Sequence, residues 1–107
     1  MRRHQSADFA ISAIVAHELF YGAYHSPRTA ENLARIDAYP FAMLDFNGED
    51  ARRAGEVRAI LAAAGASIGP YDVLIAGQAL ARDLTLITHN TREFQRVSGL
   101  QIEDWQV

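Results

Sequence analysis

The sequence predicts an α/β fold, a three-layer sandwich with a mostly parallel central sheet. Short apolar segments with strand character alternate with longer segments whose apolar residues follow the three- and four-residue spacing of helices. In addition, the segment LTLIT, residues 84–88, is apolar on both sides, as is usual for strands buried on both faces of a parallel sheet. We therefore expect helices to cover both faces of one sheet.

The composition is typical of one small domain, covering residues 1–107, with a single core. There is no cysteine, which excludes a disulfide framework and thiolate chemistry. No segment reaches the roughly 18 apolar residues of a membrane span, and no signal-peptide core follows the first basic residues. We therefore expect a cytoplasmic protein with no membrane partner. The net charge of −3 lacks the basic signature of a protein that coats DNA.

The first half of the chain is expected to form two strands and two helices. The segment DFAIS, from Asp8 to Ser12, has strand character, and AIVAHELFYGAY then changes to helical spacing, with Ser12 as its N-cap and Pro27 as its stop. Thr29 offers the cap of a second helix through TAENLARIDAY. The segment FAMLDF, residues 41–46, is expected to be the next strand.

The second half is expected to form two further helices and two strands. Asn47 and Asp50 have the spacing of a capping box before the alanine-rich helix GEDARRAGEVRAILAAAG, which Gly65 can terminate. Pro70 suits the first turn of the next helix, from Tyr71 to about Arg82. A polar turn, HNTREF, then connects the strand LTLIT to a last short strand near LQIEDW.

Two carboxylates lie on apolar helical segments. Glu18 follows the spacing of Ile14 and Tyr21, so it is expected in an apolar stripe of its helix, although it could also lie at the margin of the stripe and reach water. Asp72 lies in a first helical turn, where free backbone amides and the helix dipole favour an acid and could alone account for it. The run VLIA directly after it, however, predicts a helix buried nearly all round. An acid on such a helix faces an enclosed space.

Asn90 and Glu93 follow the carboxyl end of the predicted strand LTLIT, where ligands collect in parallel sheets. Each residue also suits a turn or a cap. Together with Glu18 and Asp72 they form an oxygen-rich set, which suits a hard cation such as Mg²⁺ or Mn²⁺. Motifs for a helical zinc protease, a cysteine-containing zinc site, a phosphate-binding glycine loop and a serine nucleophile are absent.

Several blocks of the sequence, in order, resemble one family. ISAIVAHELFYGA, ENLARID, IGPYDVLIAGQALARD and LTLITHNTREFQRVSGLQIEDW are similar to successive signature blocks of the PIN-domain ribonuclease toxins of the VapC type. The resemblance extends from about Asp8 to the C-terminus. Glu18 matches the acid of the family's ISAIxxxEL block, and Asp72 matches the acid before LIA. Asn90 and Glu93 match the more variable TxNxxEF position, where many relatives have aspartate.

The resemblance implies a PIN-like fold and a Mg²⁺- or Mn²⁺-dependent endoribonuclease toxin that cleaves RNA phosphodiester bonds. It implies catalytic roles for Glu18, Asp72, Asn90 and Glu93, with Asp72 and Glu18 on the metal. It also implies inhibition by a cognate antitoxin, a homodimer, and contact with operator DNA only through the antitoxin.

The front of the chain departs from the family pattern. Family members begin with an apolar strand that carries an aspartate and then a helix, whereas here Arg2, Arg3 and His4 look like the tail of that helix. We therefore expect an N-terminally truncated fold that lacks the central strand and one metal ligand. The start of the sequence could be placed too late, the sequence could be a fragment, or the protein could have decayed into a binding relative. The alternative function is a catalytically impaired PIN-like protein that retains antitoxin or partner binding. A further alternative is an unrelated small α/β binding domain whose acids only cap helices.

Overall fold

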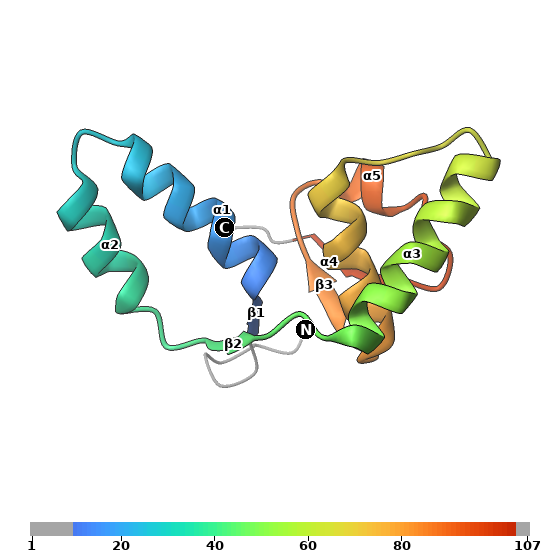
Figure 1. Cartoon of the computed structure of the whole chain (residues 1–107), viewed down its shortest axis with the longest axis horizontal. Coiled ribbons are helices and arrows are strands. Elements are labelled where there is room, and N and C mark those ends of the chain that lie inside the picture. The colour runs from blue at the N-terminus through green and yellow to red at the C-terminus, as the bar shows by residue number, and fades with distance from the viewer. Residues whose placement is uncertain (1–9, 105–107) are drawn as a thin grey trace. The chain divides into compact units, whose positions relative to one another are not determined.

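The computed structural model describes residues 10–104, which belong to two compact units, Met1–Asp45 and Phe46–Val107. Each unit contains helices and its own pair of parallel strands (Figure 1). The predicted strand positions Asp8 and Phe9 lie outside the described residues, as do Arg2, Arg3 and His4. That the whole chain acts as one domain stays a prediction. In the described part of the chain, no helix combines the length and the apolar character needed to cross a lipid bilayer.

The N-terminal unit is a helical hairpin connected to a short parallel strand pair. Ala10 pairs with Ala42 and Ser12 pairs with Leu44, so the two strands run parallel, as predicted. The elements are, in chain order, β1 (Ala10–Ser12), α1 (Ala13–His25), α2 (Thr29–Asp37) and β2 (Ala42–Leu44).

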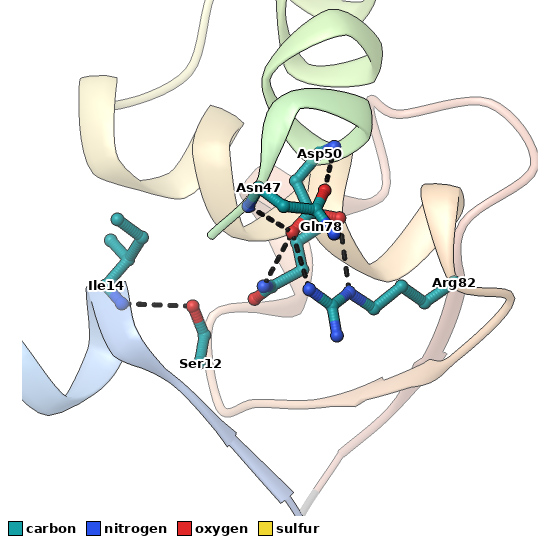
Figure 2. A network of polar contacts seen from close by, with 6 residues as sticks. All are labelled: Ser12, Ile14, Asn47, Asp50, Gln78 and Arg82. Carbon is teal, nitrogen blue, oxygen red and sulfur yellow. Dashed lines mark hydrogen bonds and ion pairs between the residues drawn. The ribbon is translucent and has the colours of Figure 1, made fainter. Parts of the chain in front are cut away.

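Helix α1 begins and ends close to the predicted signals. The Ser12 side chain accepts a hydrogen bond from the backbone nitrogen of Ile14 at 3.1 Å, which satisfies a free amide of the first turn (Figure 2). The helix ends at His25, two residues before Pro27. The predicted cap and stop of α1 are therefore confirmed.

The predicted cap of α2 is wrong by one residue. The N-cap position is Arg28, which makes no side-chain cap hydrogen bond, and Thr29 is the first helical residue. The Thr29 hydroxyl instead donates to the Ser26 carbonyl oxygen at 2.8 Å, while the Ser26 side chain accepts from the Arg28 backbone nitrogen at 3.0 Å. The serine of the connecting turn therefore takes the role that was expected of the threonine.

The buried face of α1 differs from the expected stripe. Its buried residues are Ala16 and Ala23, seven positions apart and hence on one face. Glu18 is exposed, and Tyr21 is 64% exposed. The placement of Glu18 in a buried apolar stripe is therefore wrong for the described residues, because the small alanines, and not the larger side chains, form the packed face.

The C-terminal unit contains a pair of long helices and a second parallel strand pair. Thr85 pairs with Gln101 and Ile87 with Glu103, again in parallel. The segment HNTREF, predicted as a turn, contains one short helix, because four residues after Asn90 complete a helical turn. The elements are α3 (Gly48–Ala63), α4 (Pro70–Ala81), β3 (Thr85–Ile87), α5 (Thr91–Phe94) and β4 (Gln101–Glu103).

Helices α3 and α4 approach closely in the C-terminal unit. A Cβ added to Gly77 would stand 2.5 Å from the backbone nitrogen of Ala54, so only glycine fits on α4 at the crossing. Helix α4 is buried nearly all round, as predicted from the run after Asp72. The buried core of this unit consists of Val57, Leu61, Val73, Ala76, Phe94 and Val97.

The predicted boundaries of α3 and α4 are confirmed. Asn47 and Asp50 form a reciprocal capping box, with both side-chain-to-backbone hydrogen bonds at 3.0 Å. At the other end of α3, Gly65 has a φ of 67°, and the nitrogen of the next residue, Ala66, donates to the Leu61 carbonyl oxygen at 2.9 Å. This is a Schellman motif, which glycine favours because its left-handed backbone carries no steric penalty.

Candidate functional site

Three of the four predicted site residues lie together in the C-terminal unit. Asp72 is in the first turn of α4, Asn90 is the N-cap residue of α5, and Glu93 is within α5. The carboxyl groups of Asp72 and Glu93 are joined by a hydrogen bond. The Asn90 side-chain amide donates to Oε2 of Glu93 at 2.8 Å. The fold therefore brings an acid from one helix into contact with a residue pair about 20 positions further along the chain.

Local packing positions the Asn90–Glu93 pair. Phe94, the last residue of α5, is only 3% exposed and belongs to the core of the unit. At the start of the turn, the Asn90 backbone nitrogen donates to the hydroxyl of Thr88 at 3.0 Å. A short helix such as α5 has little stability of its own, so the buried ring next to Glu93 holds this carboxylate in place.

Gly69 leaves room for the two carboxylates. This residue is the N-cap of α4, and a Cβ placed on it would stand 3.2 Å from Oδ2 of Asp72. The Gly69 backbone also makes a hydrogen bond with Glu93. A side chain at position 69 would therefore crowd Asp72, which gives this glycine a role in the shape of the site.

The contact between the two carboxyl groups changes the pKa of Glu93. Carboxylates only accept hydrogen bonds, so a bond between two of them requires that one stays protonated. The bond from Asp72 is the main cause that holds the pKa of Glu93 below its usual range, and the Asn90 amide and the Arg96 guanidinium act in the same direction.

The donor set fits a hard divalent cation. Two carboxyl groups and one amide supply oxygen ligands, and a cation between the two carboxylates would offset their mutual repulsion. Within residues 10–104, no group of three or more His, Cys, Asp or Glu side chains is arranged to hold a metal ion. The residues present therefore suit an ion that keeps several water ligands, as Mg²⁺ does.

Glu18 lies in the other unit. It is an exposed residue of α1 in the N-terminal unit, whereas Asp72, Asn90 and Glu93 belong to the C-terminal unit. The structure therefore brings together Asp72 with the Asn90–Glu93 pair, and the convergence of Glu18 with them stays a prediction.

A buried polar network holds the helix that carries Asp72, and the sequence did not predict it. The side chain of Asp50 is fully buried and accepts hydrogen bonds from Gln78 at 3.0 Å and from Nη2 of Arg82 at 2.9 Å (Figure 2). The Arg82 guanidinium is the main cause that holds the pKa of Asp50 below its usual 3.8, against burial, which raises it. The network connects the start of α3 to the last turn of α4.

The sequence does contain a signal for this network. Asp50 falls on the stripe of Ala54, Val57 and Leu61, which are the other buried residues of α3. Asp50 therefore had to be buried with the stripe, and a buried carboxylate requires polar partners. Its role as a capping residue gave a sufficient local explanation, so the tertiary role was missed.

Known proteins that are similar to this chain share one domain type. The PIN domain family matches residues 2–100, across both units. The tRNA(fMet)-specific endonuclease VapC of Shigella flexneri is 44% identical over 97 residues, which are 89% of this chain and 74% of that protein. The crystal structure of DNA-bound VapBC from Salmonella typhimurium gives a TM-score of 0.88 at 42% identity, over 91% of this chain and 75% of that chain. The structure of VapBC2 from Rickettsia felis, bound to a promoter DNA fragment, gives a TM-score of 0.87 at 37% identity. The match covers 91% of this chain and 74% of that chain. These similarities confirm the predicted α/β PIN-like fold, but the described strands form two separate parallel pairs and not the one central sheet that was expected.

Proposed function

The chain belongs to the PIN-domain family, among the VapC-type ribonuclease toxins of toxin–antitoxin systems, and we propose that it is a Mg²⁺- or Mn²⁺-dependent endoribonuclease. The observation that carries the metal-dependent chemistry is the contact between the carboxyl groups of Asp72 and Glu93. Two carboxylates this close need a proton or a cation between them, and an all-oxygen set favours Mg²⁺ or Mn²⁺.

In this proposal Asp72 is the chief metal ligand, and Glu18 is the second. When bound, the ion supplies an activated water nucleophile and offsets charge on the scissile phosphate. Asn90 acts on Glu93 through its amide, which keeps one carboxylate oxygen occupied and fixes the orientation of the group. Glu18, carried by α1, would complete the site or orient the attacking water.

The substrate in this proposal is RNA. The Shigella flexneri protein, at 44% identity, is named for its action on tRNA(fMet), which makes that tRNA the first substrate to test. A protein reads RNA sequence mainly in unpaired loops, where the bases are accessible. We therefore expect cleavage in a single-stranded segment.

The partners in this proposal are a cognate antitoxin and a second copy of the chain. The similar structures from Salmonella typhimurium and Rickettsia felis are VapBC toxin–antitoxin complexes bound to DNA. The proposal assigns operator contact to the antitoxin, because the net charge of −3 lacks the basic signature of a protein that coats DNA. A cytoplasmic location is part of the same proposal.

The experiment measures tRNA(fMet) cleavage and thermal stability of the full chain with and without Mn²⁺. An ion at 100 times its Kd stabilises a fold by about 2.7 kcal/mol, so the Tm should rise with Mn²⁺. Asp72→Asn should lose both the Mn²⁺-dependent rise and the cleavage. Glu49→Gln is the matched control. Glu49 is an acid in the first turn of α3, Asp72 is an acid in the first turn of α4, and of the two Glu49 is the exposed one.

Three results separate the alternatives. Equal behaviour of Asp72→Asn and Glu49→Gln would show that Asp72 only supports its helix, and would remove Asp72 from the proposed site. Complex formation with the antitoxin, but no cleavage by the wild-type chain at any Mn²⁺ concentration, would favour the catalytically impaired PIN-like protein. Full cleavage activity in the Glu18→Gln variant would show that Glu18 is not part of the site.

A further inference from the structure

Helix α1 presents two stacked rings on the face that carries Glu18. The rings of Tyr21 and His25 have centroids 5.5 Å apart and planes inclined by 15°. With about 3.6 residues per turn, both residues lie within roughly 60° of Glu18 around the helix axis. Side chains on a helix lean toward its N-terminus, so both rings lean toward the turn that carries Glu18.

Gly22 leaves open backbone on the same face. A Cβ at Gly22 would meet no described atom within 4 Å, whereas a Cβ at Gly77 would collide with Ala54. Glycine lowers the stability of a helix relative to alanine, so a glycine inside a helix calls for a reason. Packing among the described residues supplies that reason for Gly77, but not for Gly22 or for Gly55 of α3, which also meets no atom within 4 Å. The open backbone at Gly22 leaves room for a ligand beside the rings.

We propose that Tyr21 and His25 form a platform on which one base of the RNA substrate stacks, beside Glu18. The proposal rests on the ribonuclease function proposed above, and it assigns a positioning role to the two rings. Aromatic side chains stack on any base, and unpaired bases of RNA are commonly held in this way. A base on the platform would place the adjoining phosphate over the turns of α1 that carry Glu18.

The chemistry of this face favours a base over an apolar partner helix. Glu18 is exposed within the same face, and an apolar helix that covered the face would bury its charge without compensation. The rings themselves carry a hydroxyl and an imidazole. A nucleobase that stacks on the outer face of this ring pair leaves the carboxylate in contact with water or the ion.

The first test compares tRNA(fMet) binding and cleavage by the full chain and its variants. Tyr21→Leu should weaken RNA binding roughly 5- to 150-fold, the effect of losing one base stack. The loss should appear mainly in KM, and Tyr21→Phe, which keeps the ring, should retain the affinity. Tyr24→Leu is the matched control: Tyr24 is 68% exposed, against 64% for Tyr21, but lies about 120° from Glu18. It should bind RNA as the wild type does.

The second test uses Gly22→Ala. The added methyl group fills the open backbone beside the rings and favours the helix. The Tm of the chain should therefore rise while the RNA affinity falls. A position with a purely structural role would not show a higher Tm together with a lower RNA affinity.

Each contrary result identifies what has failed. Equal RNA affinity of Tyr21→Leu and the wild type, in a chain that cleaves tRNA(fMet), would overturn the platform and leave the ribonuclease function intact. Loss of antitoxin binding by Tyr21→Leu with unchanged RNA affinity would assign this face to the antitoxin and also overturn the platform. A wild-type chain that neither binds nor cleaves RNA would overturn the proposed function and the platform with it.

Discussion

Helices α4 and α1 are similarly apolar, and each carries one of the predicted acids, but the chain buries them very differently. Helix α1 buries only Ala16 and Ala23, and Leu19, Tyr21 and Tyr24 are exposed. Helix α4 buries half of its twelve residues, namely Val73, Ile75, Ala76, Gly77, Gln78 and Ala79.

The difference shows that apolar composition sets how much a helix can bury, while its partner sets how much it does bury. Helix α4 lies against α3 at the Gly77 crossing and is held there by Asp50. The hairpin partner of α1 is the nine-residue α2, in which no residue is buried among those described. The four predictions below test this contrast, from the largest expected effect to the smallest.

The largest effect is expected from Arg82→Met, which leaves the buried carboxylate of Asp50 without its cation. Removing one partner of a buried ion pair typically costs about 3 kcal/mol or more of the free energy of unfolding. Arg52→Met is the control, because Arg52 is exposed on α3 and should change this free energy little. Urea denaturation at pH 7 measures both. Equal free energies of unfolding for Arg82→Met and Arg52→Met would show that the network around Asp50 does not hold α4.

The ion pair between Asp50 and Arg82 also predicts how the loss of stability in Arg82→Met depends on pH. The pKa of Asp50 is lower in the folded chain than its usual 3.8, so its stabilising contribution is present above that pH and is lost as the pH falls below it. In Arg82→Met the largest cause of this lowering is absent. The difference in stability between wild type and variant should therefore be largest near pH 7 and shrink toward pH 3. A constant difference over this range would contradict the assignment.

The next effect comes from Gly77 of α4 and Gly22 of α1, whose substitutions should change the stability in opposite directions. Gly77→Ala would push α3 and α4 apart, because the new Cβ would stand 2.5 Å from the Ala54 backbone nitrogen, and overpacking typically costs about 1–3 kcal/mol. Gly22→Ala meets no described atom and should stabilise the chain by roughly 0.5–1 kcal/mol. Thermal unfolding of both variants tests this. A loss of stability in Gly22→Ala would show that α1 is packed at this face.

The smallest effects are expected from the helix caps. Loss of an N-cap side chain typically costs about 1 kcal/mol. Asn47→Ala should cost more than Ser12→Ala, because Asn47 belongs to a reciprocal box with the buried Asp50, whereas Ser12 accepts a single hydrogen bond. Amide hydrogen exchange should localise each loss to α3 or α1. Equal protection changes in both helices for either variant would mean that the two units unfold together.

The predicted elements were close to the observed ones where the signal was local. Ser12, Asn47, Gly65 and Pro70 each act within a few residues of the chain, and each marks a helix boundary in the structure. Thr29 was wrong by one position because Ser26, in the same turn, satisfies the backbone groups in its place. HNTREF was taken for a turn because four residues are too few to show helical spacing.

The site was predicted in part. Asp72, Asn90 and Glu93 were correctly expected to lie together, because the start of a buried helix and the end of a parallel strand both point to the ligand-binding edge of an α/β fold. The hydrogen bond between the two carboxyl groups and the space left by Gly69 could not be predicted. Both depend on distances between atoms that lie far apart in the chain.

The sequence by itself determined the order of the helices and strands other than α5, the α/β class and the acids of the proposed site, because spacing, caps and turn residues act over a few positions. Only the tertiary structure decided that α4 is enclosed and α1 exposed, and that Asp50 meets Gln78 and Arg82. The physical reason is that burial and ion pairing depend on which surface lies opposite a residue, and residues distant in the chain supply that surface.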